Sequence, residues 1–75
     1  MTMWKVEYFG LGDIEPIHSW TVTCDTFVEA RAVTIGRLGK ALGSVVILIG
    51  ALRNCKHAVY LRGNKVGSVK FTEAN

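Results

Sequence analysis

Two segments in the first third of the chain alternate between apolar and polar residues, which is the period of half-buried β-strands. Residues 3–9 place apolar side chains at every second position, with Lys5 and Glu7 between them. Residues 17–24 repeat the alternation, and glycine and proline residues punctuate the segment between the two, residues 10–16. The pattern predicts two antiparallel strands joined by a loop. Three large aromatic side chains fall on the face expected to point inward: Trp4, Tyr8 and Trp20.

The next segment has the spacing of a helix, with a signal at each end. Thr26 and Glu29 form a capping box, in which the threonine hydroxyl accepts a backbone N–H and the glutamate reaches back to the threonine N–H. Gly43 suits the left-handed conformation in which many helices end. The sequence therefore predicts one helix between these points. Apolar residues recur along it at helical intervals: Phe27, Val28, Ile35, Leu38 and Leu42.

Arg31 lies in the middle of this apolar stripe when the helix is projected at about 100° per residue. An unpaired buried guanidinium is costly, so the charge needs a partner. In one interpretation the head pairs with Glu7 or Glu29 while the stem packs along the edge of the sheet. In the other, Arg31 anchors a partner molecule or an anionic ligand.

Residues 45–52 are apolar at every position except Gly50, which predicts a strand with both faces covered. One helix covers one face, so the other face needs a second cover, which a second copy of the chain or a partner protein would supply. In the alternative, a strongly twisted sheet folds its last hairpin over that face. The pattern suits either side as the outward one. The residues taken as the candidate interface are Arg31, Val45, Ile47 and Ile49.

Two further strands are predicted at residues 57–61 and 65–71, joined by a two-residue hairpin turn at Gly63 and Asn64. Residues 72–75 are expected to fray. The fold class is therefore α+β, with a single helix packed on a four- or five-stranded mixed β-sheet in the order β-β-α-β-β-β. Residues 1–75 form a single domain.

The composition describes one small globular domain. The chain has 75 residues, 49% hydrophobic and 20% charged, which excludes a multidomain or a disordered chain. Cys24 and Cys55 are too few for a disulfide-rich secreted scaffold, and no signal peptide is visible, so we expect a cytoplasmic protein. The longest apolar stretch, residues 41–52, is too short for a membrane span.

Charge divides the chain into two halves. Residues 1–30 carry one base and five acids, giving −4, whereas residues 31–75 carry eight bases and one acid, giving +7. A right-handed crossover would bring four bases to one edge of the sheet, where they could contact nucleic acid or another anion: Arg37, Lys40, Arg62 and Lys65. The loop that carries Asp13 and Glu15 is expected at the same edge, where it would offset part of the positive field.

No arrangement typical of a catalytic site is present, so we expect no enzyme and no cofactor. No glycine-flanked nucleophile occurs, and the glycines of the first loop are not followed by a helix, as a phosphate-binding loop requires. The spacing of the available soft ligands does not suit a tetrahedral metal site, and we expect two buried thiols and two half-exposed histidines instead. These ligands are His18, Cys24, Cys55 and His57.

In the segment from Val22 to Ala30, a strand runs into a threonine cap that is followed by Glu-Ala. This local sequence pattern resembles one that is common in small accessory proteins of bacteriophages. The resemblance covers about ten residues and includes no catalytic residue. It implies a protein that binds and alters a host protein.

Three functions are compatible with these observations. The first is a non-catalytic interaction protein that associates with itself and binds a macromolecular partner, and the exposed side of residues 45–52 favours it. The second is a small basic nucleic-acid-binding protein. The third is an oligomer that sequesters an anionic small molecule or nucleotide at a subunit boundary.

Overall fold

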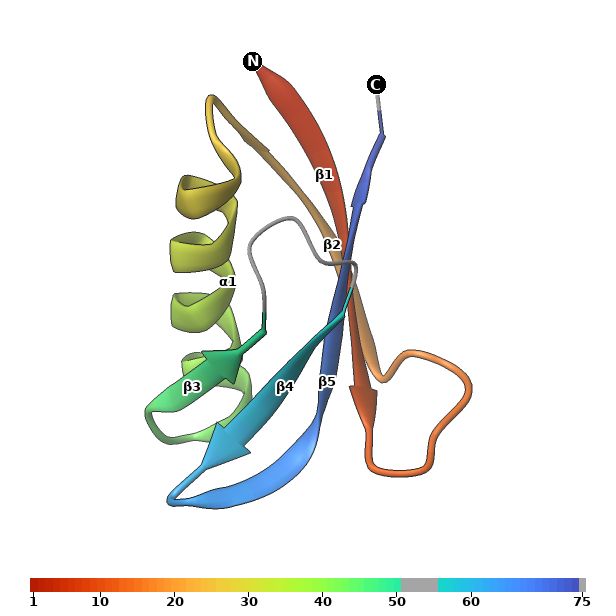
Figure 1. Cartoon of the computed structure of the whole chain (residues 1–75), viewed down its shortest axis with the longest axis vertical. Helices are drawn as coiled ribbons and strands as arrows, with labels where there is room; N and C mark the ends of the chain where they lie inside the picture. The colour runs from red at the N-terminus through yellow and green to blue at the C-terminus, as the bar shows by residue number, and fades with distance from the viewer. Residues whose placement is uncertain (51–55, 75) are drawn as a thin grey trace.

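The computed structural model describes residues 1–50 and 56–74 as five strands and one helix (Figure 1). The elements are β1 (Thr2–Gly10), β2 (His18–Cys24), α1 (Phe27–Leu42), β3 (Val46–Ile49), β4 (Lys56–Leu61) and β5 (Asn64–Glu73). The α+β class is confirmed. The strand predicted at residues 45–52 is shorter at both ends, and its positions 51 and 52 lie outside the described residues.

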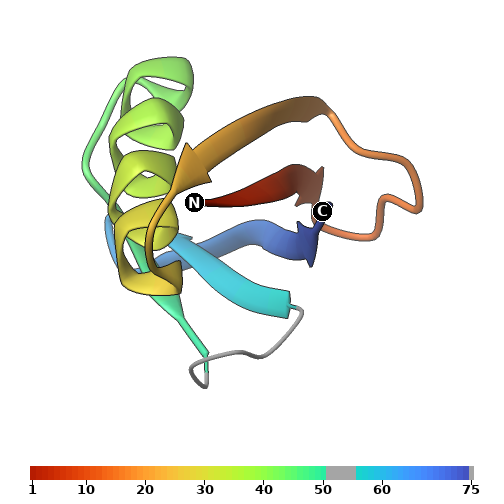
Figure 2. The ribbon, with the colours of Figure 1, turned by 90° about the horizontal axis from the view of Figure 1, so that it is seen from above.

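The five strands form one sheet in the order β2-β1-β5-β4-β3, in which every neighbouring pair is antiparallel. The expected mixed sheet is therefore wrong. The strands before and after α1 do run in the same direction, but they lie at opposite edges of the sheet, so they never pair. The last two strands continue the sheet and do not fold over its outer face. α1 lies on one side of the sheet and contacts both edge strands (Figures 1 and 2).

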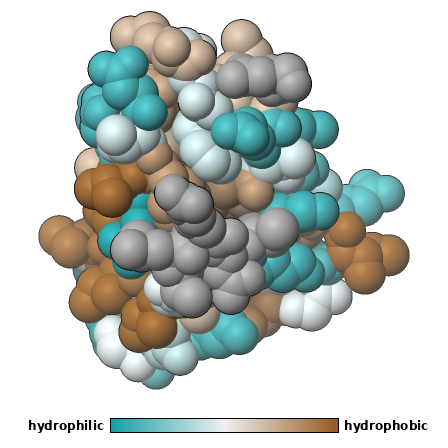
Figure 3. Space-filling view, turned by 45° about the horizontal axis from the view of Figure 1, so that its top comes forward, coloured by the Kyte–Doolittle hydropathy of each residue, from teal (hydrophilic) through white to brown (hydrophobic). Residues whose placement is uncertain are grey.

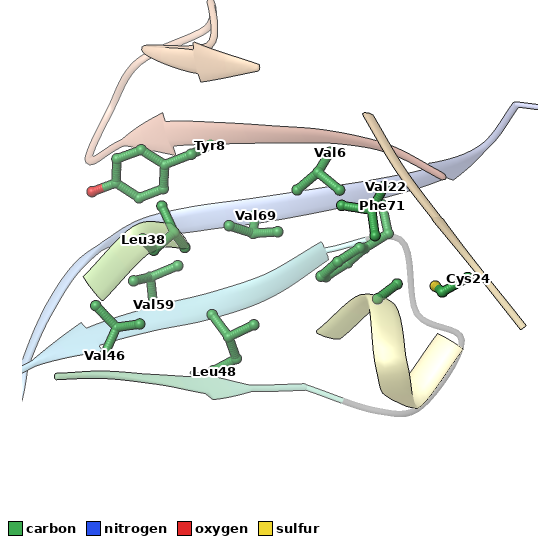
Figure 4. Packing of buried hydrophobic residues seen from close by; sticks show 11 residues of the cluster. Val6, Tyr8, Val22, Cys24, Leu38, Val46, Leu48, Val59, Val69 and Phe71 are labelled. Carbon is green, nitrogen blue, oxygen red and sulfur yellow. The ribbon is translucent and has the colours of Figure 1, made fainter. Parts of the chain in front are cut away.

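The core lies between α1 and the inner face of the sheet (Figure 4). Leu38 supplies the largest fully buried side chain, and burial of a side chain of this size contributes roughly 1.5–3 kcal/mol. Tyr8 is buried as expected, whereas Trp4 and Trp20 are half-buried at the margin of the core. The core consists of Val6, Tyr8, Val22, Cys24, Ala30, Leu38, Val46, Leu48, Val59, Val69 and Phe71.

Both ends of α1 are capped by the residues that the sequence indicated. The Thr26 hydroxyl accepts the Glu29 N–H at 3.2 Å. The Glu29 carboxylate accepts a hydrogen bond from that hydroxyl at 3.2 Å, not from the Thr26 N–H as expected. Gly43 ends the helix with φ 75°, and the N–H of Ser44 donates to the Gly39 carbonyl at 3.1 Å.

The β4–β5 turn lies one residue earlier than predicted. Leu61 pairs with Asn64, so the two central residues are Arg62 and Gly63, with φ of 52° and 81°. Positive φ at both positions defines a type I′ turn, which matches the twist of a hairpin. The prediction favoured Gly63 and Asn64 because these residues tolerate positive φ, whereas the strand register requires it of Arg62. β5 also extends to Glu73, so the expected fraying before this residue is wrong.

Arg62→Asn is expected to stabilise the protein, since asparagine adopts the left-handed conformation at lower cost than arginine. We expect the free energy of unfolding to rise by about 0.5–1 kcal/mol in urea denaturation. Arg62→Lys is the control, because it keeps both the charge and the conformational cost. Equal stability of the two variants would contradict this account of the turn.

Candidate interaction surface

β3 is an edge strand, with β4 as its one neighbour in the sheet. Its side chains alternate: Val46 and Leu48 are buried, whereas Ile47 and Ile49 are 57% and 56% exposed. Val45, directly before the strand, is 80% exposed. The structure thus turns toward solvent the side of this strand that carries the proposed interface residues. We refer to Val45, Ile47 and Ile49 as the β3 surface.

Hydrophobic surface also gathers at a second place, the β1–β2 loop at residues 11–17. Figure 3 shows brown surface on the side where α1 and β3 lie and a separate group at the far side, where this loop protrudes. The loop exposes Leu11, Ile14 and Ile17. The sequence pattern identified the loop by its glycines and proline, and did not single out these aliphatic residues.

An open groove of about 470 Å³ separates the carboxyl-terminal half of α1 from the turn into β3. Glycine and aliphatic residues line it, with Ser44 and Lys40 as the polar members. The groove continues into the β3 surface through Val45, which belongs to both. Within residues 1–50 and 56–74 a single cation lines the groove, which therefore suits an apolar group better than an anion.

Arg31 has a partner inside the protein. Its guanidinium donates a hydrogen bond to the main-chain carbonyl of Leu48 in β3. The expected pairing with Glu7 or Glu29 is therefore wrong, because the guanidinium donates to a backbone oxygen and not to a carboxylate. The half-buried stem agrees with the interpretation in which the side chain packs along the sheet edge.

The strand register explains why the Leu48 carbonyl is open to Arg31. Leu61 pairs with Asn64 across a two-residue turn, so its main-chain groups face β5. The alternation of an antiparallel ladder then turns the main-chain groups of Val59 toward β5, and those of its partner Leu48 away from β4. Arg31 therefore supplies a donor to the free edge of the sheet.

Three of the four predicted basic contact residues lie at one end of the molecule. Lys40 is in the last turn of α1, and Arg62 and Lys65 belong to the β4–β5 hairpin, whose turn lies at the same end in Figure 1. Arg37 lies about one turn earlier, with its guanidinium carbon 5.7 Å from the centre of the Trp20 ring. The loop at residues 11–17 reaches this end too, but on the side away from α1, so its acids lie apart from Lys40 (Figures 1 and 2).

The sequence reasoning missed a second basic group, on the outer face of the sheet. Lys56 and Lys70 are cross-strand partners on β4 and β5, and both alternate with residues buried on the inner face. The Lys56 ammonium lies 5.8 Å from the centre of the Phe9 ring. A signal was present in the polar positions of residues 68–72, but the pairing of Lys70 with Lys56 depends on the register between two strands.

The metal-ligating side chains that the structure describes do not gather. Burial, and next the charge of Glu29, raise the pKa of the Cys24 thiol, which donates to the Thr26 carbonyl at 3.3 Å. Cys24 is therefore a buried, protonated thiol at neutral pH, as expected, while Cys55 lies outside the described residues. His18 is exposed, but His57 is buried against the rings of Phe27 and Phe71, contrary to expectation. No three histidine, cysteine or acidic side chains among the described residues form a metal-binding group.

Tyr8 shows the same effect of burial. Its hydroxyl donates to the Val66 carbonyl at 3.3 Å, and burial, followed by the charge of Asp13, raises its pKa above the ordinary value. Tyr8 is a structural residue of the core that remains neutral around pH 7.

Comparisons with protein-family models, curated proteins and solved structures found no match for this chain. In residues 1–50 and 56–74, no helix has the length and apolar character needed to cross a membrane.

Proposed function

We propose that this chain is a non-catalytic interaction protein that associates with itself through the β3 surface. The observation that carries the proposal is the exposure of Ile47 and Ile49, each more than half accessible, on a strand at the edge of the sheet. Exposed aliphatic side chains gathered in one place on a small soluble domain are typical of protein contacts.

The chemistry of β3 favours a second copy as the partner. The strand VILI carries no charged side chain, so two copies can approach without repulsion between like charges. Natural sheets commonly protect an edge strand with lysine or proline. β3 contains neither, although Arg31 of α1 donates a hydrogen bond to the Leu48 carbonyl at this edge. The apolar groove beside Val45 extends the surface that a second copy could cover. A symmetric dimer would use the same patch on both subunits.

Ile47→Lys is expected to dissociate the assembly. Light scattering coupled to size exclusion should give the unmodified chain, at tens of micromolar, a mass of at least twice 8.2 kDa, and the variant a monomer mass. In a dimer of the variant, the lysine of each copy would place a charge against the apolar surface of the other copy, and burying an unpaired charge is costly. Val33→Lys is the control, because Val33 is an exposed aliphatic residue on α1, away from the β3 surface.

A strictly monomeric unmodified chain at this concentration would contradict self-association. The same result would fit a different occupant of the β3 surface, such as the host protein that the resemblance to bacteriophage accessory proteins implies. Equal dissociation by the α1 control would show that the contact lies elsewhere. Circular dichroism of both variants separates loss of association from loss of folding.

The anion-sequestering oligomer has less support, because Lys40 is the one charged residue in the described lining of the groove. Nucleic-acid binding is favoured by a separate observation, on the outer face of the central strands.

A further inference from the structure

The face of the sheet turned away from α1 carries lysines and aromatic rings on its central strands. On β1, Val6 and Tyr8 point into the core, so Lys5, Glu7 and Phe9 point outward. The same alternation turns Lys70 of β5 outward, and on β4 it does so for Lys56 and Tyr60. We refer to Lys5, Phe9, Lys56, Tyr60, Lys65 and Lys70 as the lysine–aromatic face.

Positive charge dominates this face. Lys56 and Lys70 lie directly opposite each other on neighbouring strands, an arrangement of like charges that disfavours folding slightly. Lys65 lies opposite Tyr60, and Lys5 lies opposite Thr72, which adds two more cations around this pair. Glu7, opposite Lys70, is the acid of the group. Four lysines against one carboxylate complement a polyanion.

The aromatic rings add a second kind of contact. Phe9 and Tyr60 are both half-buried, and they stand on strands that are separated by β5 and whose axes lie roughly 10 Å apart. Ala58 is level with Phe9, so Tyr60 lies two positions further along β4. The Lys56 ammonium lies 5.8 Å from the centre of the Phe9 ring, which places a cation beside a ring on the outer face. Rings on a sheet face, flanked by cations, can stack on unpaired bases while the cations bind the backbone phosphates.

We propose that the lysine–aromatic face binds single-stranded nucleic acid without sequence specificity. Charge complementarity supports a polyphosphate backbone, and the rings favour a strand whose bases are free to stack over a duplex. The proposal differs from the basic set predicted from the sequence, because Arg37 and Lys40 lie on α1, on the other side of the sheet. The lysine–aromatic face borders the β3 surface, because Ile47 lies directly opposite Tyr60 on the same side of the sheet. A self-associated chain would therefore cover part of this face, and the mass of each variant has to be measured together with its affinity.

Fluorescence anisotropy with a labelled oligothymidine of about 12 nucleotides tests the proposal. The variant Lys56→Gln with Lys70→Gln is expected to lose about tenfold in affinity at 50 mM salt. The slope of log affinity against log salt should fall in magnitude by about 1.4, because each phosphate contact with a single strand contributes about 0.7. Lys40→Gln with Arg62→Asn removes the same charge at the other site and should change affinity less than about twofold.

Two single variants separate specific contacts from net charge. Glu7→Gln should tighten binding about twofold or more, because it removes the acid beside Lys70. Phe9→Leu should weaken binding about fivefold while the salt slope stays the same, since stacking involves no counterion release. If Phe9→Leu does not fold by circular dichroism, Tyr60→Leu serves the same purpose.

Several outcomes would overturn the proposal. One is an absence of binding at about 50 mM salt, and another is tighter binding to a duplex of the same length. The third is an equal loss of affinity in the two double variants, Lys56→Gln with Lys70→Gln and Lys40→Gln with Arg62→Asn. Equal losses would mean that net charge alone drives binding. Measuring the mass of each variant by light scattering keeps this test apart from the test of self-association.

Discussion

Gly67→Ala is expected to prevent folding. Gly67 lies in β5, opposite Gly10 of β1 and Val59 of β4, in the middle of the sheet. A β-carbon at this position would lie well under 3.0 Å from the main-chain carbonyl of Phe9. A backbone atom cannot rotate away as a side chain can, so β1 and β5 would have to separate. The expected loss is several kcal/mol, on the order of the whole stability of a domain of this size.

Gly36→Ala provides a matched comparison, because the same methyl group is added in the middle of α1. There it meets no atom of the surrounding structure within 4 Å beyond the adjacent helix backbone, so only the helix preference of alanine acts. We expect the free energy of unfolding to rise by about 0.5–1 kcal/mol, and the Tm by several degrees.

Thermal unfolding followed by circular dichroism measures both glycine variants. The expected result is opposite signs: no cooperative transition, or a greatly lowered Tm, for Gly67→Ala, and a raised Tm for Gly36→Ala. A folded Gly67→Ala variant with a Tm near that of the unmodified chain would show that the β1–β5 pairing is not as close as described.

Arg31→Met is expected to lower the free energy of unfolding by about 1–3 kcal/mol, because the Leu48 carbonyl loses its charged donor while the volume of the stem is kept. Urea denaturation measures the change. Arg37→Met is the matched control on the same helix, since the Arg37 guanidinium interacts with the ring of Trp20 and not with a main-chain carbonyl. We expect a smaller loss there, about 0.5–1 kcal/mol.

Partner binding distinguishes the two interpretations of Arg31. A stability loss of about a kilocalorie or more, with self-association intact, supports the structural role. Unchanged stability with lost association would contradict it and would make Arg31 part of the interface.

The parts of the fold that depend on nearby residues could be predicted from the sequence. Thr26 and Gly43 set the ends of α1 through hydrogen bonds within a few residues, and the alternation in residues 3–9 and 17–24 depends on one hairpin. The order of the strands could not be predicted in this way, because it depends on pairing between β1 and β5, which are far apart in the chain.

The candidate surfaces show the same limit. The apolar pattern of residues 45–52 does not show which side of the strand faces α1. The exposure of Ile47 and Ile49 could therefore be assigned only from the structure. Lys56 and Lys70 are 14 positions apart and become neighbours through the β4–β5 register, which includes a bulge beside Val59. The acceptor of Arg31 is a main-chain oxygen, and a search for opposite charges in the sequence does not find it.

The central position of β1 and β5 also has a consequence for the folding pathway. The β1–β2 and β4–β5 hairpins can form early, because each closes a short loop, but neither half has a complete core. The β1–β5 ladder joins them by pairing residues as distant as Trp4 and Glu73, so the loop-closure entropy of almost the entire chain opposes this step. We therefore expect formation of the β1–β5 ladder to limit the folding rate.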